Sequence, residues 1–383
     1  MSLVLNEDQQ ILKDTAKNFC QQDATISVLR KLRDEKDQQG YSREIWQKMA
    51  ELGWTGMVIP EVHGGFDFGY GGLGVVLEET GHTLISSPLI STVLLSATAI
   101  NLAGSDEQKA ATLPAIVKGG LIVCLAVDEK PVHCPTFIST RAQKSANGFT
   151  LNGRKVFVLD GHVADKIIVV ARTSGEDDSV NGISLFLVDS GTSGIDIQRT
   201  HMVDNRNAAT ITFTDVEVAQ SALLGELDLG YKTLQRTLDI GCIGLAAEML
   251  GSVIEVFERI VDYLKTRKQF GVVIGSFQGL QHRAANMYSE IELCKSVVRE
   301  AFSALDSTSE GQDENIARLA SLAKAKLSEV YFTVSNEGVQ MHGGMGMTDE
   351  FDIGFFLKRA RVAQQFLGDA RFHRDRYATL HGF

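Results

Sequence analysis

Two changes in the periodicity and composition of the sequence predict that this 383-residue chain is an α+β, multi-domain protein. Helical periodicity dominates the first part, a segment rich in β-branched residues follows, and long helical patterns then return. We therefore expect an N-terminal α-helical domain over 1–119, a middle β-barrel or β-sandwich over 120–228, and a C-terminal four-helix bundle over 229–383.

The N-terminal domain carries recognisable helix starts. Asn6, with Gln9 three residues later, is typical of a capping box, and Ser105 can cap a helix from Asp106 to about Gly119. After Asn6 the helical period places four residues on one face, which we expect to be buried: Ile11, Leu12, Thr15 and Phe19.

The middle domain consists of short apolar or β-branched runs, the first of which is LIVCLAV over 121–127. Within the run 149–159, the pair Asn152-Gly153 predicts a turn between two β-segments. Further strand-like runs cover 166–172, 183–189 and 209–218.

The C-terminal domain shows four long helical patterns separated by short loops, as expected of a bundle. They cover Tyr231–Thr266, Gln278–Leu305, Asp313–Met341 and Asp352–Leu380.

Composition excludes some classes of function. A net charge of −11 argues against a nucleic-acid partner, because phosphate binding needs a basic face. The 5 cysteines form no CxxC pair, which indicates reduced thiols and no zinc site. The N-terminus lacks the pattern of a signal peptide, and we expect no apolar run long enough to span a bilayer, so the expected location is the cytoplasm.

Two motifs near the bundle suggest ligand contacts. In KTRKQFG, residues 265–271, basic residues end a helix; this can be simple dipole capping, or Arg267 can bind a pyrophosphate while Phe270 packs on an aromatic ring. In QMHGGMGM, residues 340–347, the glycines can be an ordinary helix C-cap or can let backbone approach a bulky ligand.

In this order, the motifs resemble the acyl-CoA dehydrogenase flavoprotein family over essentially the whole chain. The residues 266–271 with Phe277-Gln278 match the family pattern E/T-R-x-x-F-G followed by F/H-Q, and 340–346 matches Q-x-x-G-G-x-G. The run 152–161, NGRKVFVLDG, looks like the strand pair that places an aromatic residue beside the flavin ring.

The resemblance implies an FAD cofactor, an acyl-CoA substrate, an electron-transferring flavoprotein as electron acceptor, and a homo- or hetero-oligomer such as a dimer or tetramer. It also implies lipid degradation as the setting. The FAD contacts that it implies are Leu125, Val127, Asp128, Phe157, Val158, Leu159, Arg267, Phe270, Phe277, Gln278, Gln340, Gly343, Gly344, Asp369 and Arg371.

The catalytic base is missing from its expected place. The family removes the α-proton of an acyl thioester with a glutamate, while the β-hydrogen leaves as hydride to the flavin. The motif FLGD, residues 366–369, puts Leu367 at the glutamate position, and the alternative position of the family falls at or close to Gly241. Three carboxylates remain as candidates: Asp369, Asp239 and Glu248.

Each candidate is geometrically poor. Asp369 lies two residues after Leu367, which on one continuous helix means about 200° of rotation, and its slot usually holds a flavin-contacting threonine. Asp239 has the same relation to Gly241, and Glu248 lies about two turns beyond it. We expect each of the three to be a structural or solvated carboxylate and not a base. Asp369 is the candidate that lies in the segment where the family carries its glutamate.

A second departure lies at 127–136, VDEKPVHCPT, where the family typically shows T-E-P-x-A-G-S-D. A helper for phosphate binding is lost; His133 can replace it as a donor, although we expect a plain loop histidine.

Three hypotheses remain. In the first, the chain is an acyl-CoA dehydrogenase with a displaced carboxylate. In the second, it is a non-catalytic subunit whose partner chain carries the glutamate; the FLGDA motif resembles that of a family branch that forms α2β2 assemblies and degrades sterol side chains or dicarboxylic acyl chains. In the third, it is a flavin oxidase or monooxygenase on the same scaffold. The sequence does not identify the acyl group of the substrate. Gly241 only leaves room for a bulky acyl group.

Overall fold

The computed structural model describes residues 5–307 and 312–383. The chain separates into two compact units, each assembled from discontinuous segments. The helical unit comprises Met1–Leu29, Tyr70–Ile85 and Cys242–Phe383, and the sheet unit comprises Arg30–Gly69 and Ser86–Gly241.

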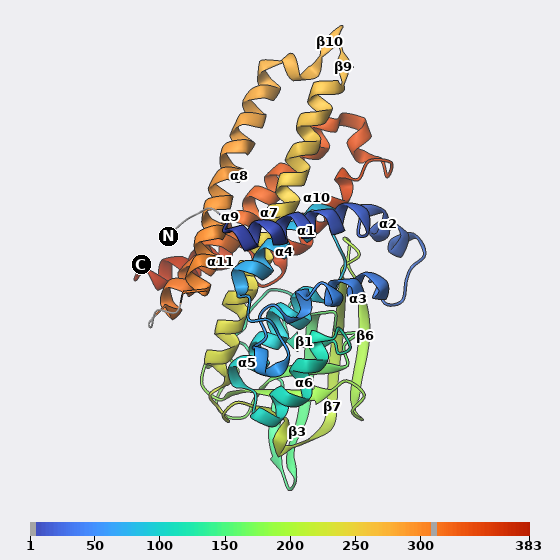
Figure 1. Cartoon of the computed structure of the whole chain (residues 1–383). Coiled ribbons are helices and arrows are strands. Elements are labelled where there is room, and N and C mark those ends of the chain that lie inside the picture. The colour runs from blue at the N-terminus through green and yellow to red at the C-terminus, as the bar shows by residue number, and fades with distance from the viewer. Residues whose placement is uncertain (1–4, 308–311) are drawn as a thin grey trace. The chain divides into compact units, whose positions relative to one another are not determined.

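The helical unit is a bundle of long helices (Figure 1). Helices α7 and α8 run side by side and are joined at one end by a small hairpin, while α9 packs against α8, α10 and α11. The elements are α1 (Glu7–Gln22), α4 (Tyr70–Thr83), most of α7 (Gly230–Thr266), β9 (Lys268–Gln269), β10 (Val272–Val273), α8 (Gln278–Leu305), α9 (Asp313–His342), η6 (Gly343–Met347), α10 (Ile353–Gln365) and α11 (Ala370–Leu380).

Helices α4 and α7 approach each other closely because glycines lie at their crossing. A Cβ placed on Gly251 would lie 1.8 Å from the Glu78 carbonyl oxygen, and one on Gly81 would lie 2.1 Å from the Glu248 carbonyl oxygen. The Ser252 hydroxyl also donates to the Gly81 carbonyl at 2.9 Å. Backbone therefore meets backbone at this crossing, and no side chain larger than hydrogen fits there.

The expectation of one helix over Asp352–Leu380 is wrong. Helix α10 ends at Gln365 and α11 begins at Ala370. Between them Leu367 has φ +58° and Gly368 has φ +95°, a left-handed backbone that stops a helix. The apolar period continues across the break, which is why periodicity alone does not reveal it.

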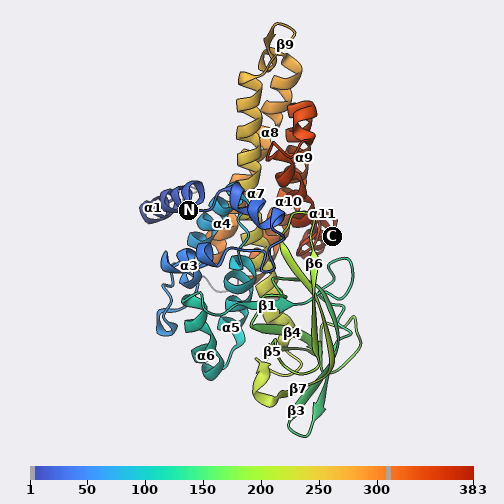
Figure 2. The ribbon, with the colours of Figure 1, turned by 90° about the vertical axis from the view of Figure 1, so that its right-hand side faces the viewer.

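The sheet unit contains the middle β domain, and the predicted fold class is confirmed. Its described strands belong to one hydrogen-bonded sheet with the order β6-β7-β3-β2-β4-β5-β8, and β1 pairs in parallel with β4 (Figure 2). The strands are β1 (Val123–Ala126), β2 (Arg141–Ser145), β3 (Gly148–Leu159), β4 (Lys166–Arg172), β5 (Ile183–Asp189), β6 (Ile195–His201), β7 (Asn207–Ala219) and β8 (Leu223–Leu224).

Helical segments complete the sheet unit, and the π-helix η3 packs against β1. They include α3 (Arg43–Glu51), η3 (Leu89–Ala97), α5 (Thr98–Ala103) and α6 (Asp106–Val117), while α2 (Ile26–Asp34) begins in the helical unit and ends here.

The turn predicted at Asn152-Gly153 is wrong, because β3 continues through these residues. Asn152 pairs with Arg141 on β2, and the register against β7 shifts between Leu151 and Gly153. The hairpin between β2 and β3 closes earlier, where Ser145 pairs with Gly148. The sequence offers a second Asn-Gly pair at 147–148, and it is this pair that ends the two-residue turn.

Local signals elsewhere have mixed outcomes. The predicted capping box at Asn6 with Gln9 is confirmed, and so is the predicted cap at Ser105, where the structure adds Gln108 as the second member of a box. The predicted apolar face of α1 is buried only in part: Phe19 is buried, whereas Ile11 is 63% exposed, and the other buried residues are Ala16 and Cys20. The buried face is rotated relative to the most apolar positions of the first turns.

The expectation about bilayer-spanning runs is also wrong by length and composition. Helix α7 contains an 18-residue window with mean hydropathy 1.7, enough to cross a membrane. However, 83% of that window is buried inside the protein, as in the central helix of a bundle.

We predict that Gly251→Ala lowers the free energy of unfolding by about 3 kcal/mol or more, because overpacking at a backbone contact forces α4 and α7 apart. Gly354→Ala in α10 is the matched control, since a Cβ there meets nothing within 4 Å. Urea unfolding of both variants measures the difference; equal stabilities would contradict the close crossing.

Candidate functional site

In the sheet unit, the residues expected beside a flavin ring lie on two neighbouring segments. Leu125 and Val127 belong to β1 and the residue after it, and both are buried. The Val156 amide of β3 donates to the Asp128 carbonyl at 2.8 Å, so that the segments 125–128 and 157–159 lie side by side. The structure therefore brings together these two sets of predicted site residues.

Phe157 is the member of the second set that is directed outward. It is 43% exposed, whereas Val158 and Leu159 are 2% and 8% exposed. Its φ is +52°, uncommon for a residue with a bulky side chain. The position coincides with a bulge in β3, because Lys155 pairs with Ile211 whereas Val158 pairs with Ala209.

A buried ion pair lies beneath this bulge, and the sequence analysis missed it. The Lys155 ammonium is fully buried and lies 2.7 Å from Glu129 Oε1. Burial alone would raise the pKa of Glu129, but the charge and hydrogen bond of Lys155, with donors from Ser139 and Thr140, lower it to about 2. The available sequence signal was a lysine directly before the apolar run 156–159, two residues before Phe157.

Asp128 is held as an acceptor. His133 Nδ1 lies 2.9 Å from Asp128 Oδ2, and the Cys134 amide donates to Oδ1 at 3.2 Å. His133 is thus a loop histidine whose side chain, 5% exposed, engages the carboxylate of Asp128 near the end of β1.

In the helical unit, a second set of predicted contacts lies around the β9–β10 hairpin. Arg267 follows the last residue of α7, and Gln278 is the first residue of α8; both are exposed. Phe270 is 89% exposed with φ +56°, and its ring centroid lies 6.2 Å from that of Phe277. Two exposed aromatic rings beside an arginine form a surface that suits a planar, anionic ligand.

The glycines after α9 leave backbone open. A Cβ built on Gly343 or Gly344 meets nothing within 4 Å, although the φ of +60° at Gly343 itself favours glycine there. Gln340 lies one turn earlier and is exposed. Bare backbone of this kind can lie against a bulky ligand.

The segment between α10 and α11 is fixed by buried side chains. Leu367 is 4% exposed, and its carbonyl accepts a hydrogen bond from His373 Nε2 at 2.8 Å, with Cys242 Sγ at 3.7 Å. The next carbonyl, of Gly368, accepts from Lys324 Nζ at 2.6 Å. The position where the family carries its glutamate is thus occupied by a buried apolar side chain, on a loop whose carbonyls are hydrogen-bonded by buried side chains.

Lys324 is a further residue that the sequence analysis missed. Its ammonium is fully buried and donates also to the Gln364 carbonyl and the Ser328 hydroxyl, both at 3.2 Å. Burial lowers the pKa of Lys324 from 10.5 to about 8, against upward contributions from Cys242 and Asp369.

Asp369 is not on a helical turn shared with Leu367, so the rotation of about 200° does not apply. It is the N-cap of α11, and its Oδ1 accepts the Phe372 amide at 2.8 Å. Asp369 and Arg371 line one surface hollow with Gln364, Arg374 and Asp375.

The other two candidate carboxylates are buried. Asp239 is 4% exposed and Glu248 is 5% exposed. Glu248 Oε1 lies 3.5 Å from a nitrogen of Arg359, whose side chain is also buried.

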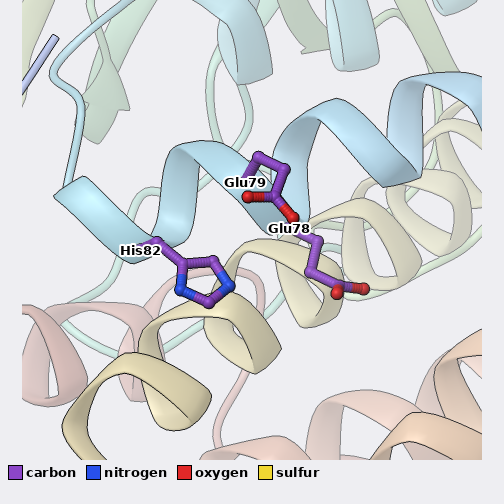
Figure 3. A group of neighbouring side chains, drawn as sticks. All are labelled: Glu78, Glu79 and His82. Atoms are coloured by element: carbon purple, nitrogen blue, oxygen red, sulfur yellow. The ribbon is translucent and has the colours of Figure 1, made fainter. Parts of the chain in front are cut away.

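One group of side chains on α4 has the spacing of a metal site, namely Glu78, Glu79 and His82 (Figure 3). However, the Lys13 ammonium lies 2.7 Å from Glu78 Oε1 and 3.5 Å from Glu79 Oε1. Burial would lower the pKa of Lys13, but these carboxylates raise it, so the cation that they hold is the lysine.

Comparison with known proteins matches three consecutive family models to the chain. They are the acyl-CoA dehydrogenase N-terminal domain over residues 6–120, the middle domain over 134–216 and the C-terminal domain over 228–379. The chain therefore belongs to the acyl-CoA dehydrogenase family, whose members are FAD-binding oxidoreductases.

Relatives cover nearly the full length of both chains. The caffeyl-CoA reductase-Etf complex subunit CarC of Acetobacterium woodii is 28% identical, with 96% of this chain and 97% of the relative covered. The butyryl-CoA dehydrogenase of Megasphaera elsdenii is 27% identical with a TM-score of 0.89 and 100% of each chain covered. The steroid ACAD Tcur3481-Tcur3483 is 28% identical with a TM-score of 0.87 and 98% of each chain covered.

We predict that Lys324 makes stability depend on alkaline pH. Because its folded pKa of about 8 lies below its ordinary value of 10.5, the unfolded chain binds more protons between these pH values. The wild type should therefore gain stability relative to Lys324→Met as pH rises from 8 to 10.5, by up to roughly 3 kcal/mol. Urea unfolding at several pH values measures this gain, and parallel curves would contradict it.

Proposed function

We propose that this chain is an FAD-dependent oxidoreductase that desaturates an acyl-CoA thioester between its α and β carbons. The observation that carries the proposal is the exposure of the ligand-type residues of the helical unit: Arg267, Phe270, Gln278 and the open backbone of Gly343-Gly344. Exposure of two phenylalanine rings next to an arginine, one of them (Phe270) on a backbone with positive φ, does not stabilise a helical bundle by itself.

The residues present fit an FAD molecule. The guanidinium of Arg267 can bind a pyrophosphate bidentately, the rings of Phe270 and Phe277 can cover an aromatic base, and Phe157 can stack on a flavin ring. FAD, when bound, supplies the acceptor for the hydride that leaves the β-carbon. Other residues of the predicted set differ in exposure: within the sheet unit Leu125, Val127, Val158 and Leu159 are buried, and within the helical unit Gln340 and Arg371 are exposed.

The proton acceptor within this chain is Asp369. Leu367 has no basic atom, and Glu248 is engaged with Arg359. The N-cap occupies Oδ1 of Asp369, so Oδ2 is the oxygen that would take the α-proton. A carboxylate within reach of the substrate carbon is sufficient for this step.

A second candidate function is a base-free subunit of a hetero-oligomer. It is favoured by the buried, rigidly held Leu367 at the glutamate position and by the role of Asp369 as a cap. The similarity to the steroid ACAD Tcur3481-Tcur3483, a name with two components, and to a subunit of a reductase-Etf complex supports assembly with other chains. An electron-transferring flavoprotein would take the electrons in both cases.

We predict that Arg267→Ala weakens FAD binding about 10- to 100-fold, the loss expected for a charge-assisted bidentate contact. Lys268→Ala, the adjacent exposed residue, is the matched control and should bind FAD as the wild type does. Equilibrium dialysis of the purified chain, with any copurifying partner, measures both constants. Equal affinities for the two variants would place the pyrophosphate elsewhere.

We predict that Asp369→Asn lowers kcat at least about 100-fold with FAD retained, because asparagine preserves the N-cap but accepts no proton. Turnover of an acyl-CoA with a ferrocenium acceptor measures the effect. Unchanged turnover would assign the base to a partner chain, and release of hydrogen peroxide in place of acceptor reduction would indicate an oxidase.

A further inference from the structure

The buried pair of Lys155 and Glu129 ties the segment after β1 to the bulge of β3. Lys155 Nζ donates to the Val127 carbonyl at 2.9 Å as well as to Glu129 Oε1 at 2.7 Å. Glu129 in turn accepts the Ser139 amide at 2.7 Å and the Thr140 amide at 3.0 Å. One ammonium and one carboxylate thus connect three stretches of chain.

The bulge exposes an amide that the sheet does not use. Val156 and Phe157 lie opposite the single residue Thr210, since the flanking pairs are Lys155 with Ile211 and Val158 with Ala209. The Val156 amide donates to the Asp128 carbonyl at 2.8 Å, away from the ladder with β7. The pair holds the 127–129 segment where that carbonyl can accept, and the chain then turns Phe157 outward with φ +52°.

The chemistry of the pair indicates more than stability. A buried ion pair is a weak source of folding energy, because desolvation of both charges offsets their attraction, and apolar replacements are often neutral. Burial lowers the pKa of Lys155 even with Glu129 beside it. What an apolar pair could not supply is a donor for the Val127 carbonyl and acceptors for the 139–140 amides, which fix geometry.

We propose that Lys155 and Glu129 are positioning residues that hold the ring of Phe157 in place against the isoalloxazine of FAD. This rests on the FAD binding proposed above, and it assigns to the pair a role in cofactor geometry that the family pattern of aromatic residue and flavin does not include.

The test is a double-mutant cycle on FAD affinity. Removal of Lys155 alone would leave the Glu129 carboxylate buried without a countercharge, so the variant is Lys155→Met with Glu129→Gln. This pair carries no charge and keeps one carbonyl oxygen as acceptor for one of the two amides that Glu129 binds, those of Ser139 and Thr140. Phe157→Ala removes the ring, and a triple variant combines the changes. Phe186→Leu, fully buried on β5, is the control for loss of packing in the same sheet.

We expect Phe157→Ala to weaken FAD binding about tenfold, as for one lost aromatic stack. The charge-free pair variant should weaken it by a similar factor, and the triple variant by no more than the larger single effect, because contacts that act as one unit are not additive. Flavin fluorescence of the bound cofactor should rise in all three. Phe186→Leu should lower Tm and leave FAD affinity unchanged.

Additive losses of about 100-fold in the triple variant, or wild-type affinity in the charge-free pair variant, would overturn the inference while the proposed function stands. If the pair variant does not fold, Lys155→Arg, which keeps the charge but displaces the donor, replaces it in the cycle with the same criteria. A wild-type chain that takes up no FAD with its natural partners present would overturn the proposed function itself.

Discussion

Two fully buried ammonium groups govern the parts of this molecule that do not follow regular secondary structure. Lys155 holds the Val127 carbonyl beside the bulge of β3, and Lys324 holds the Gly368 carbonyl between α10 and α11. In each case a bulky residue with positive φ lies close by, namely Phe157 and Leu367. Such a backbone costs of order 1–3 kcal/mol and persists only when its surroundings over-determine it. A lysine supplies three donors at one point, so one ammonium can bind several acceptors of the chain, as Lys324 binds the carbonyls of Gln364 and Gly368.

The break between α10 and α11 changes how the missing base is understood. On one continuous helix, Asp369 would point away from the site of Leu367, and the family geometry would exclude it. In the structure Asp369 begins a new helix, so its direction is set by the cap to Phe372 and by the loop that Lys324 and His373 hold. The suitability of Asp369 as a base therefore depends on the geometry of its N-cap carboxylate and not on helical phase.

The sequence predicts the fold well wherever one local rule acts alone. The predicted caps at Asn6 and Ser105 are correct because each needs two residues in a fixed spacing. The hairpin was misplaced because the chain has two Asn-Gly pairs, and only the register of β2 against β3 decides that Gly148 and not Gly153 closes the turn. Lys155 and Lys324 look like surface residues in a list of letters; their burial depends on tertiary contacts with Glu129 and Gly368, 26 and 44 residues away. Residues proposed to bind a ligand through exposure, such as Phe270, are predicted from a motif and not from a physical pattern.

Cofactor surface and proton acceptor are separable in this fold. The surface suited to FAD depends on exposed rings, an arginine at a helix end and glycine backbone, all of which tolerate changes in the 366–369 loop. The base depends on one side chain in that loop, and here the position is filled by a leucine whose carbonyl is bound by His373 and whose side chain is buried. The described packing of α9, α10 and α11 therefore does not require a carboxylate at Leu367. The FAD binding proposed above is for this reason compatible with either proposed proton acceptor, Asp369 or a carboxylate from another subunit.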